Sequence, residues 1–258
     1  MNKLKLPKLE ILFLLFYLSA LITGEYFVAF YNLQLGLVLE AMILFALLIH
    51  SSVTRSEHLG YLLRSMTALP VVLIVSLSIP LIPLPQIYWL LLIAIPIFAI
   101  SIALIKVQGL SLQDVGLNLN YLPIQILVAL IGILFGMAEY FILEPKPIIP
   151  TLNLEPFIIS TIIIFISTGL AEELLFRGII QRNAQKALGA GFGILYSTLL
   201  FTVLNIGQNS FPDLIFIFLV GLFYGYIFYK TKSIVGIALA HGMSNIILLL
   251  ILPYYLLL

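Results

Sequence analysis

The stretch Phe157–Arg177, FIISTIIIFISTGLAEELLFR, joins a long apolar run to two adjacent glutamates and an arginine. A carboxylate that faces hydrocarbon costs several kcal/mol, so ionisable groups at membrane depth are usually paired or functional. Glu173 and Arg177 stand four residues apart on one helical face, acid first, and can form an ion pair there. Glu172 points about 100° away around the helix. The stretch therefore predicts a membrane helix in which one carboxylate is paired and its neighbour is left for chemistry or binding.

A second interpretation of the same residues stays open. Long charged side chains near a helix end often reach the headgroup region while their stems stay in the apolar layer. In that case Glu172, Glu173 and Arg177 form a solvated cluster at the membrane surface and carry no chemistry.

The composition shows that the chain is built for lipid. Hydrophobic residues make up 62% of its 258 residues, charged residues make up 9%, and the mean hydropathy is +1.20. Soluble domains carry about 25% charged residues. The net charge of +1 argues against a nucleic-acid surface. Cysteine is absent, which excludes disulfides, thiolate catalysis and cysteine metal ligands.

Hydropathy predicts an all-α fold, a polytopic bundle of eight to nine transmembrane helices. The nine candidate ranges are Ile11–Tyr31, Leu35–His50, Leu62–Ile82, Ile87–Ile105, Leu122–Ile142, Phe157–Ala171, Phe192–Ile206, Leu214–Tyr229 and Ile234–Leu252. The eight-span alternative makes one of the first helices re-entrant or interfacial. Gly221 and Gly225 lie one turn apart in the eighth range, a spacing that lets another helix approach closely, and we expect packing within the molecule there.

The distribution of basic residues predicts the orientation. With nine spans, one side of the membrane holds eleven of the twelve basic residues and the other holds only Lys146. The eleven are Lys3, Lys5, Lys8, Arg55, Arg64, Lys106, Arg177, Arg182, Lys186, Lys230 and Lys232. The positive-inside rule then predicts a cell-membrane protein with a cytoplasmic N-terminus and an external C-terminus. It puts the two glutamates at the cytoplasmic end of the sixth span, and we expect the site to open towards the cytoplasm.

Two further groups of polar residues lie inside apolar segments. His241 and Asn245 stand four residues apart on one helical face. Two polar groups that point the same way favour the wall of a functional site over a histidine that only packs between helices. Asn205 taken alone indicates only a hydrogen bond between helices. A carboxylate can take a proton from water, an imidazole can assist it or bind a metal, and an amide can hold an oxyanion. These groups suit hydrolysis by activated water better than covalent catalysis.

Three other acids, Glu25, Glu40 and Glu139, sit in or near apolar ranges, and their spacing selects no role. Each can pair with another helix or lie at an interface. Together with the motif they suggest an alternative of another class, an ion-coupled transporter. Against it stands the absence of any visible internal repeat.

The ordered motifs resemble those of a known family. Glu-Glu-x-x-x-Arg, then Phe-x-x-x-His, then His-x-x-x-Asn on successive helices is typical of the CAAX prenyl protease and bacteriocin-processing (CPBP, or Abi) intramembrane proteases, which include the Ras-converting CAAX endopeptidases. The first element matches Glu172, Glu173 and Arg177, and the last matches His241 and Asn245. The resemblance covers roughly residues 122–250. It implies two parts of one membrane-embedded unit, N-terminal helices over residues 1–121 and a protease core over residues 122–258.

The resemblance also implies roles for these residues. Glu172 would activate water, His241 would act as a metal ligand or electrostatic partner, and Asn245 would stabilise the oxyanion. Glu173, which the family counts in its motif, and Arg177 would mainly hold the helix end. Family substrates are prenylated C-terminal peptides or membrane-associated peptides, so the expected partners are such a peptide and membrane lipid. No oligomeric state follows from the sequence.

The middle element departs from the family pattern. Phe201 matches, but Asn205 stands where the family has its histidine. Asparagine cannot act as a base, and its amide oxygen is a poor transition-metal ligand beside imidazole. The implied zinc ion, with His241 and Glu172 as ligands, would therefore be held more weakly than in relatives that keep the histidine. Two outcomes follow: an enzyme that runs on Glu172 and His241, or a non-catalytic member that binds or scaffolds membrane partners.

Overall fold

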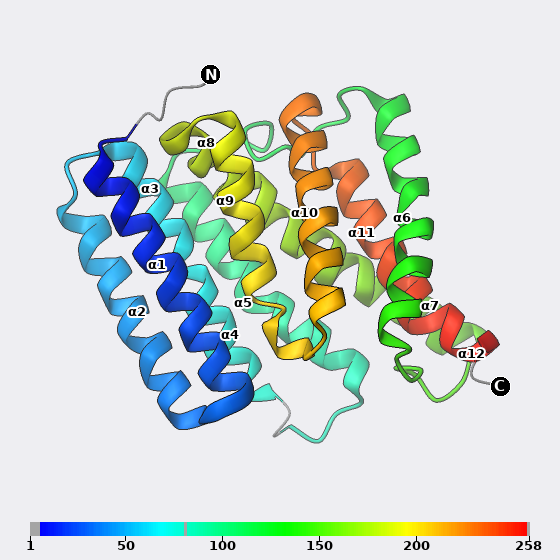
Figure 1. The fold of residues 1–258 in the computed structure, drawn as a ribbon. Coiled ribbons are helices and arrows are strands. Elements are labelled where there is room, and N and C mark those ends of the chain that lie inside the picture. The colour runs from blue at the N-terminus through cyan, green and yellow to red at the C-terminus, as the bar shows by residue number, and fades with distance from the viewer. Residues whose placement is uncertain (1–5, 80–81, 257–258) are drawn as a thin grey trace.

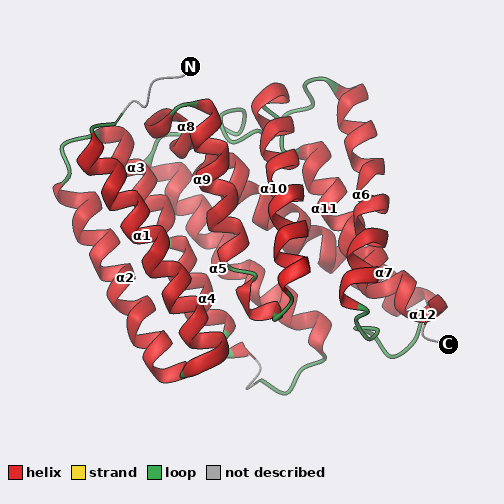
Figure 2. Ribbon diagram, viewed as in Figure 1, coloured by secondary structure: helices red, strands yellow, loops and turns green. Residues whose placement is uncertain are grey.

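The computed structural model describes residues 6–79 and 82–256, and in these ranges the regular elements are helices, with no strand (Figure 2). Eight helices there are long and apolar enough to cross a membrane. Their outward surfaces expose leucine, isoleucine and phenylalanine side chains, which suits a lipid solvent. The predicted all-α, polytopic bundle is confirmed, and the protein is an integral, multi-pass membrane protein.

The helices pack side by side along the bundle (Figure 1). The first half comprises α1 (Lys8–Tyr26), its π-helical continuation η1 (Phe27–Tyr31), α2 (Leu33–Val53), α3 (Glu57–Met66), α4 (Ala68–Ser76) and α5 (Gln86–Val107). The second half comprises α6 (Leu122–Leu143), α7 (Leu154–Ile164), η3 (Phe165–Glu172), η4 (Leu174–Gln181), α8 (Arg182–Leu188), α9 (Ala190–Val203), η5 (Ile206–Gln208), α10 (Phe211–Thr231), α11 (Val235–Ile246), η6 (Ile247–Ile251) and α12 (Leu252–Leu256). Each of the nine predicted ranges overlaps one or more of these helices, although the range Leu62–Ile82 starts inside α3 and Phe192–Ile206 extends beyond the end of α9. The end of the range Leu62–Ile82 touches residues 80–81, which lie outside the described residues.

The helix α9 is the short member of the set. It is an apolar helix of 14 residues, whereas α1 with η1 and α2 are full-length candidates. The eight-span alternative is therefore wrong about the position of the short segment, which lies in the second half of the chain.

The helix that carries the two glutamates is much longer than the sequence predicts. It runs without a break over Leu154–Leu188, 35 residues, so Glu172 lies near its middle. The prediction that the motif sits at the end of the span is wrong. Hydropathy reads Glu172–Arg177 as a boundary, but these charges are satisfied inside the protein and do not end the helix. The segments η3 and η4 on either side of Glu173 are wound as π-helix, a rare form that is frequent at functional sites.

Local signals explain the sharp connections between helices. Asn32 is extended and its Oδ1 accepts a hydrogen bond of 2.9 Å from the Leu35 amide, which caps α2 directly after η1. Ser210 caps α10 in the same way. Gly189 has φ of 88°, a conformation that favours glycine, and it lets α9 turn back from α8 without a loop.

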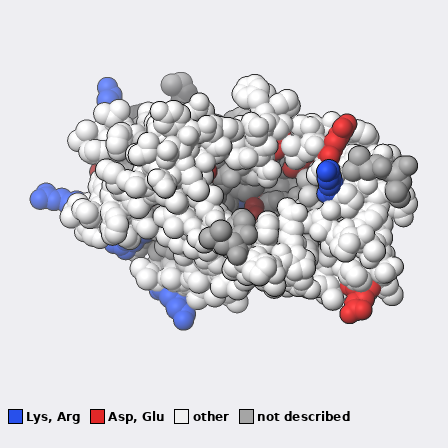
Figure 3. Space-filling model, turned by 90° about the horizontal axis from the view of Figure 1, so that it is seen from below, with Lys and Arg blue, Asp and Glu red and all other residues white. Residues whose placement is uncertain are grey.

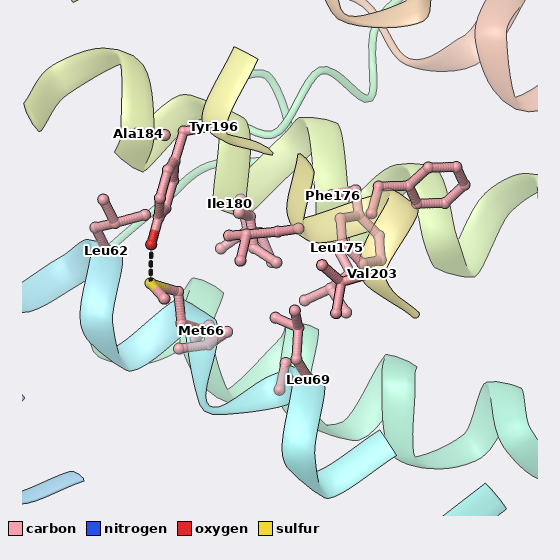
Figure 4. Packing of buried hydrophobic residues seen from close by; sticks show 14 of the residues in the cluster. Leu62, Met66, Leu69, Leu175, Phe176, Ile180, Ala184, Tyr196 and Val203 are labelled. Carbon is pink, nitrogen blue, oxygen red and sulfur yellow. Dashed lines mark hydrogen bonds between the residues drawn. The ribbon is translucent and has the colours of Figure 1, made fainter. Parts of the chain in front are cut away.

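The N-terminal helices and the later helices share one hydrophobic core (Figure 4). Leu62, Met66 and Leu69 from α3 and α4 face Leu175 and Ile180 of η4, with α8 and α9 closing the cluster. The Tyr196 hydroxyl of α9 lies 3.6 Å from the Met66 sulfur and donates a hydrogen bond of 2.9 Å to the Leu14 carbonyl. These contacts fit a single membrane-embedded unit, and the division at residue 121 stays a prediction.

One face of the bundle gathers most basic residues. The helix ends and loops at the top of Figure 1 carry Lys8, Arg55, Lys106, Arg182, Lys186, Lys230 and Lys232, and Lys146 follows the lower end of α6. These residues follow the predicted partition, but Arg177 does not, because it is buried inside the long helix. Lys3 and Lys5 lie outside the described residues. In the loop after α5, hydrogen bonds from the backbone and hydroxyl of Ser111 lower the pKa of Asp114 to about 2. Asp114 also pairs with Arg182 at 3.1 Å and so ties this loop to α8.

Candidate active site

Glu173 contacts two other residues of the motifs, Arg177 and His241. Its Oε2 lies 3.2 Å from Arg177 Nε, which is the predicted i,i+4 pair, and its Oε1 lies 2.9 Å from His241 Nδ1. Glu173 is fully buried, so it joins the long helix to α11 through two charge-assisted contacts. A carboxylate at Nδ1 places the proton of a neutral ring on that nitrogen and leaves Nε2 with the lone pair. The residue spacing predicts only Arg177 as a partner of Glu173, and the contact with His241 is additional.

Arg177 is buried as deeply as its partner. Its side chain is 2% exposed, its Cζ lies 4.6 Å from the centre of the Phe201 ring, and its Nη2 donates to the Gly221 carbonyl at 3.4 Å. One turn on, Gln181 donates to the Gly225 carbonyl at 2.8 Å. The interpretation of the motif as a solvated surface cluster is therefore wrong. The expected role of Gly221 and Gly225 in packing within the molecule is confirmed.

Four of the predicted site residues line one cavity of about 270 Å³: Glu172, Asn205, His241 and Asn245. Glu173 and Arg177, which were also predicted, are not part of its lining. Its polar lining consists mainly of Glu139, Glu172, Asn205, His241, Ser244 and Asn245. These side chains come from α6, the long helix, the end of α9 and α11. The structure thus brings Glu172, His241 and Asn245 together, as the motif spacing suggested, and adds Glu139 and Ser244 to them.

Asn205 lies where the family pattern would place a histidine, at the wall of this cavity. Its amide nitrogen donates a hydrogen bond of 3.0 Å to the Phe201 carbonyl one turn earlier. This bond fixes the side chain and leaves the amide oxygen as the group with free acceptor capacity. Neither His50 nor His58 lines the cavity, and His50 instead contacts the Tyr17 hydroxyl at 3.2 Å.

A second cavity of about 240 Å³ shares a wall with the first. Glu172, Phe201, Asn205 and Gln208 line both. The second cavity continues between α1, α4 and α5, where Glu25 supplies a further carboxylate. Glu172 therefore stands at the border of two adjoining chambers.

Both chambers lie towards the lower ends of the helices. Their walls include Gln208, which precedes α10, and Leu143 and Pro145 at the end of α6. Seen from below, the surface is hollowed near its centre, with acidic atoms visible inside the hollow (Figure 3). The basic loops lie at the opposite ends of the same helices. The expectation that the site opens on the side of the basic loops is wrong.

The donor set is a poor fit to a zinc ion. Structural and catalytic zinc sites use at least three histidine, cysteine or carboxylate ligands. Among the described residues, no group of three or more such side chains is placed to hold a metal. His241 Nδ1 is already engaged by Glu173, and Asn205 offers only an amide oxygen. The chemistry below is accordingly assigned to protein groups alone.

Several cavity residues escaped the sequence analysis. Ser244 and Gln208 carry no distinctive spacing, and Glu25 and Glu139 had been noted without a role. Only the packing of α1 and α6 against the long helix and α11 brings these acids to Glu172. A signal for Glu139 existed in the pair Gly132 and Gly136 just before it, which marks a close helix contact.

Comparison with known proteins identifies the part of the chain that holds the motif. Residues 154–247 match the family model described as type II CAAX prenyl endopeptidase Rce1-like. The match begins with the long helix and includes Glu172, Glu173, Arg177, Asn205, His241 and Asn245. No curated protein and no solved structure matched the chain.

Proposed function

Because residues 154–247 match the family model of type II CAAX prenyl endopeptidases, we propose that the chain is an intramembrane endopeptidase. Its substrate is a prenylated or otherwise membrane-associated peptide. The observation that carries the proposal is the shared cavity, in which Glu172, His241, Asn205 and Asn245 converge from three helices.

Glu172 is the general base in this proposal. It takes a proton from a water molecule in the cavity, and the resulting hydroxide attacks the carbonyl carbon of the scissile bond. The protonated Glu172 then gives the proton to the leaving nitrogen as the carbon–nitrogen bond breaks. One water is consumed, and its hydroxyl and proton end on the new carboxyl group and the new amine.

Other residues position the water and the developing charge. His241, held at Nδ1 by Glu173, presents Nε2 as an acceptor that orients the water. The Asn245 amide donates to the oxyanion of the tetrahedral intermediate, a contact that strengthens as charge develops. The Asn205 amide oxygen is an alternative to His241 Nε2 as the acceptor for the second hydrogen of the water.

The test is peptide cleavage by the purified protein in lipid nanodiscs. The Glu172→Gln variant keeps the shape of the side chain but removes the base, so the rate is expected to fall about 10²- to 10⁴-fold. The matched control is Glu155→Gln, since Glu155 is exposed at the start of α7. Equal rates for Glu172→Gln and the native protein would contradict the assignment of Glu172.

A second candidate function rests on Asn205. With an amide where the family pattern has a histidine, the chain would keep the cavity as a binding site for membrane peptides without hydrolysing them. The same cleavage assay separates the two, because a non-catalytic member binds the peptides and releases them intact.

A further inference from the structure

Two carboxylates outside the family-matched segment flank Glu172 on opposite sides. Glu25 comes from α1 and lines the chamber between α1, α4 and α5. Glu139 comes from α6 and lines the chamber that holds His241 and Asn245. Each chamber thus has its own acid in addition to the glutamate at their shared wall.

Glu25 is buried without a partner. Its side chain is 3% exposed, and its Oε1 atom has no hydrogen-bond partner among the described residues. A buried carboxylate that lacks a partner is costly, so such groups are usually matched by a ligand or another charge. The chamber in front of Glu25 is where that partner can enter.

Glu139 is fixed in place by the helix contact beneath it. A Cβ atom on Gly132 would collide with the Ala240 carbonyl oxygen, and one on Gly136 would collide with that of Ser244. The two glycines therefore hold α6 directly against α11. One turn further, Glu139 reaches the cavity, with its Oε2 3.5 Å from the Ser244 hydroxyl.

Lysine and arginine are missing from the walls of both chambers as the structure describes them. The nearby Arg177 is held by Glu173 and packs on the Phe201 ring. The two chambers therefore favour cationic groups and disfavour carboxylates.

We propose that the two chambers are subsites for basic side chains of the substrate, with the scissile bond at Glu172 between them. Glu139 binds a lysine or arginine on one side of the bond, and Glu25 binds one on the other. This inference rests on the proposed endopeptidase function and adds the substrate class to it.

The test uses two series of peptides, one varied at a residue before the scissile bond and one varied at a residue after it. In each series the varied residue is Lys, Gln or Glu. For the native protein in nanodiscs, kcat/KM is expected to be about tenfold higher for Lys than for Gln, and lowest for Glu. In the Glu25→Gln variant, the ratio of kcat/KM for the Lys peptide to that for the Gln peptide is expected to fall towards one in one series. In the Glu139→Gln variant, the same ratio is expected to fall in the other series. The control Glu155→Gln retains both ratios. Equal rates for Lys, Gln and Glu peptides on the native protein overturn the inference and leave the endopeptidase function standing.

A binding measurement separates this inference from the proposed function. Fluorescence anisotropy of labelled peptides on the Glu172→Gln protein reports affinity without cleavage. Tighter binding of the Lys peptides supports the acidic subsites even where the native protein hydrolyses nothing. Equal affinities for the Lys and Glu peptides would overturn the proposal of acidic subsites.

Discussion

Arg177 shows how a single charge is accommodated in the middle of a membrane helix. Its guanidinium contacts a carboxylate, a backbone carbonyl and an aromatic face, and water scarcely reaches it. Removing one partner of a buried pair leaves the other charge uncompensated, which costs about 3–5 kcal/mol. The motif arginine is thus a structural residue that also sets Glu173 for its contact with His241.

The first prediction compares two arginines. Arg177→Met is expected to lower the free energy of unfolding by about 3–5 kcal/mol. Arg182→Met removes a more exposed ion pair with Asp114 and is expected to cost about 0–1 kcal/mol. Unfolding in mixed micelles measures both, and equal losses would contradict the burial argument.

The second prediction concerns Asn205. The Asn205→His variant adds an imidazole to the cavity that holds Glu172 and His241, and imidazole is a strong zinc ligand. Bound zinc per protein is expected to rise over the native protein, as measured by elemental analysis after dialysis. Asn153→His, at an exposed site before α7, is the control. Equal zinc in Asn205→His and native protein would show that position 205 does not limit metal binding.

At the scale of residues, the sequence predicted which side chains line the cavity. It predicted only some of the hydrogen bonds and ion pairs between them. Glu172, His241 and Asn245 were grouped because their motifs repeat the order of a known family, and they line one cavity. The bond from His241 to Glu173 depends on the rotation of two helices about their axes, which a spacing of residues does not specify.

At the scale of elements, the contact between α6 and α11 sets the shape of the cavity. The third prediction tests it with matched glycines. In Gly136→Ala the new methyl group meets the Ser244 carbonyl oxygen, and overpacking of this kind costs about 1–3 kcal/mol. Gly191→Ala in α9 meets nothing within 4 Å and should leave stability unchanged or raise it by up to about 1 kcal/mol. Thermal unfolding separates the two, and similar melting temperatures would refute the close packing.

The helices themselves were largely predictable, because runs of about 20 apolar residues have few alternatives in a bilayer. The length of the long helix was not, since the sequence predicts a helix only as far as Arg177, whereas the helix continues to Leu188. Glu173, Arg177 and Gln181 are buried and bonded to neighbouring helices, so they continue the apolar span instead of ending it. Tertiary contacts decided where this element stops.

At the scale of the whole molecule, the orientation in the membrane decides which compartment reaches the site. The positive-inside rule predicts that the face with the basic loops is cytoplasmic. The chain has no cysteine, so single cysteines report accessibility without background.

The fourth prediction follows. Thr151→Cys, on the exposed loop after α6, is expected to react with a membrane-impermeant maleimide in intact cells. Gln113→Cys, on the exposed loop after α5, should react only after the membrane is opened. The reverse labelling pattern would show that the protein has the opposite orientation and that the site opens to the cytoplasm.

The placement of the chambers and the basic loops at opposite ends of the bundle has a consequence for traffic across the membrane. A polypeptide made in the cytoplasm arrives on the side of the basic loops if these are cytoplasmic. It must then be translocated, at least in part, before its scissile bond comes to the hollow face. Cleavage would therefore follow export. The soluble fragment would be released on the side opposite the basic loops. The bilayer would thus protect chains that have not been exported from cleavage.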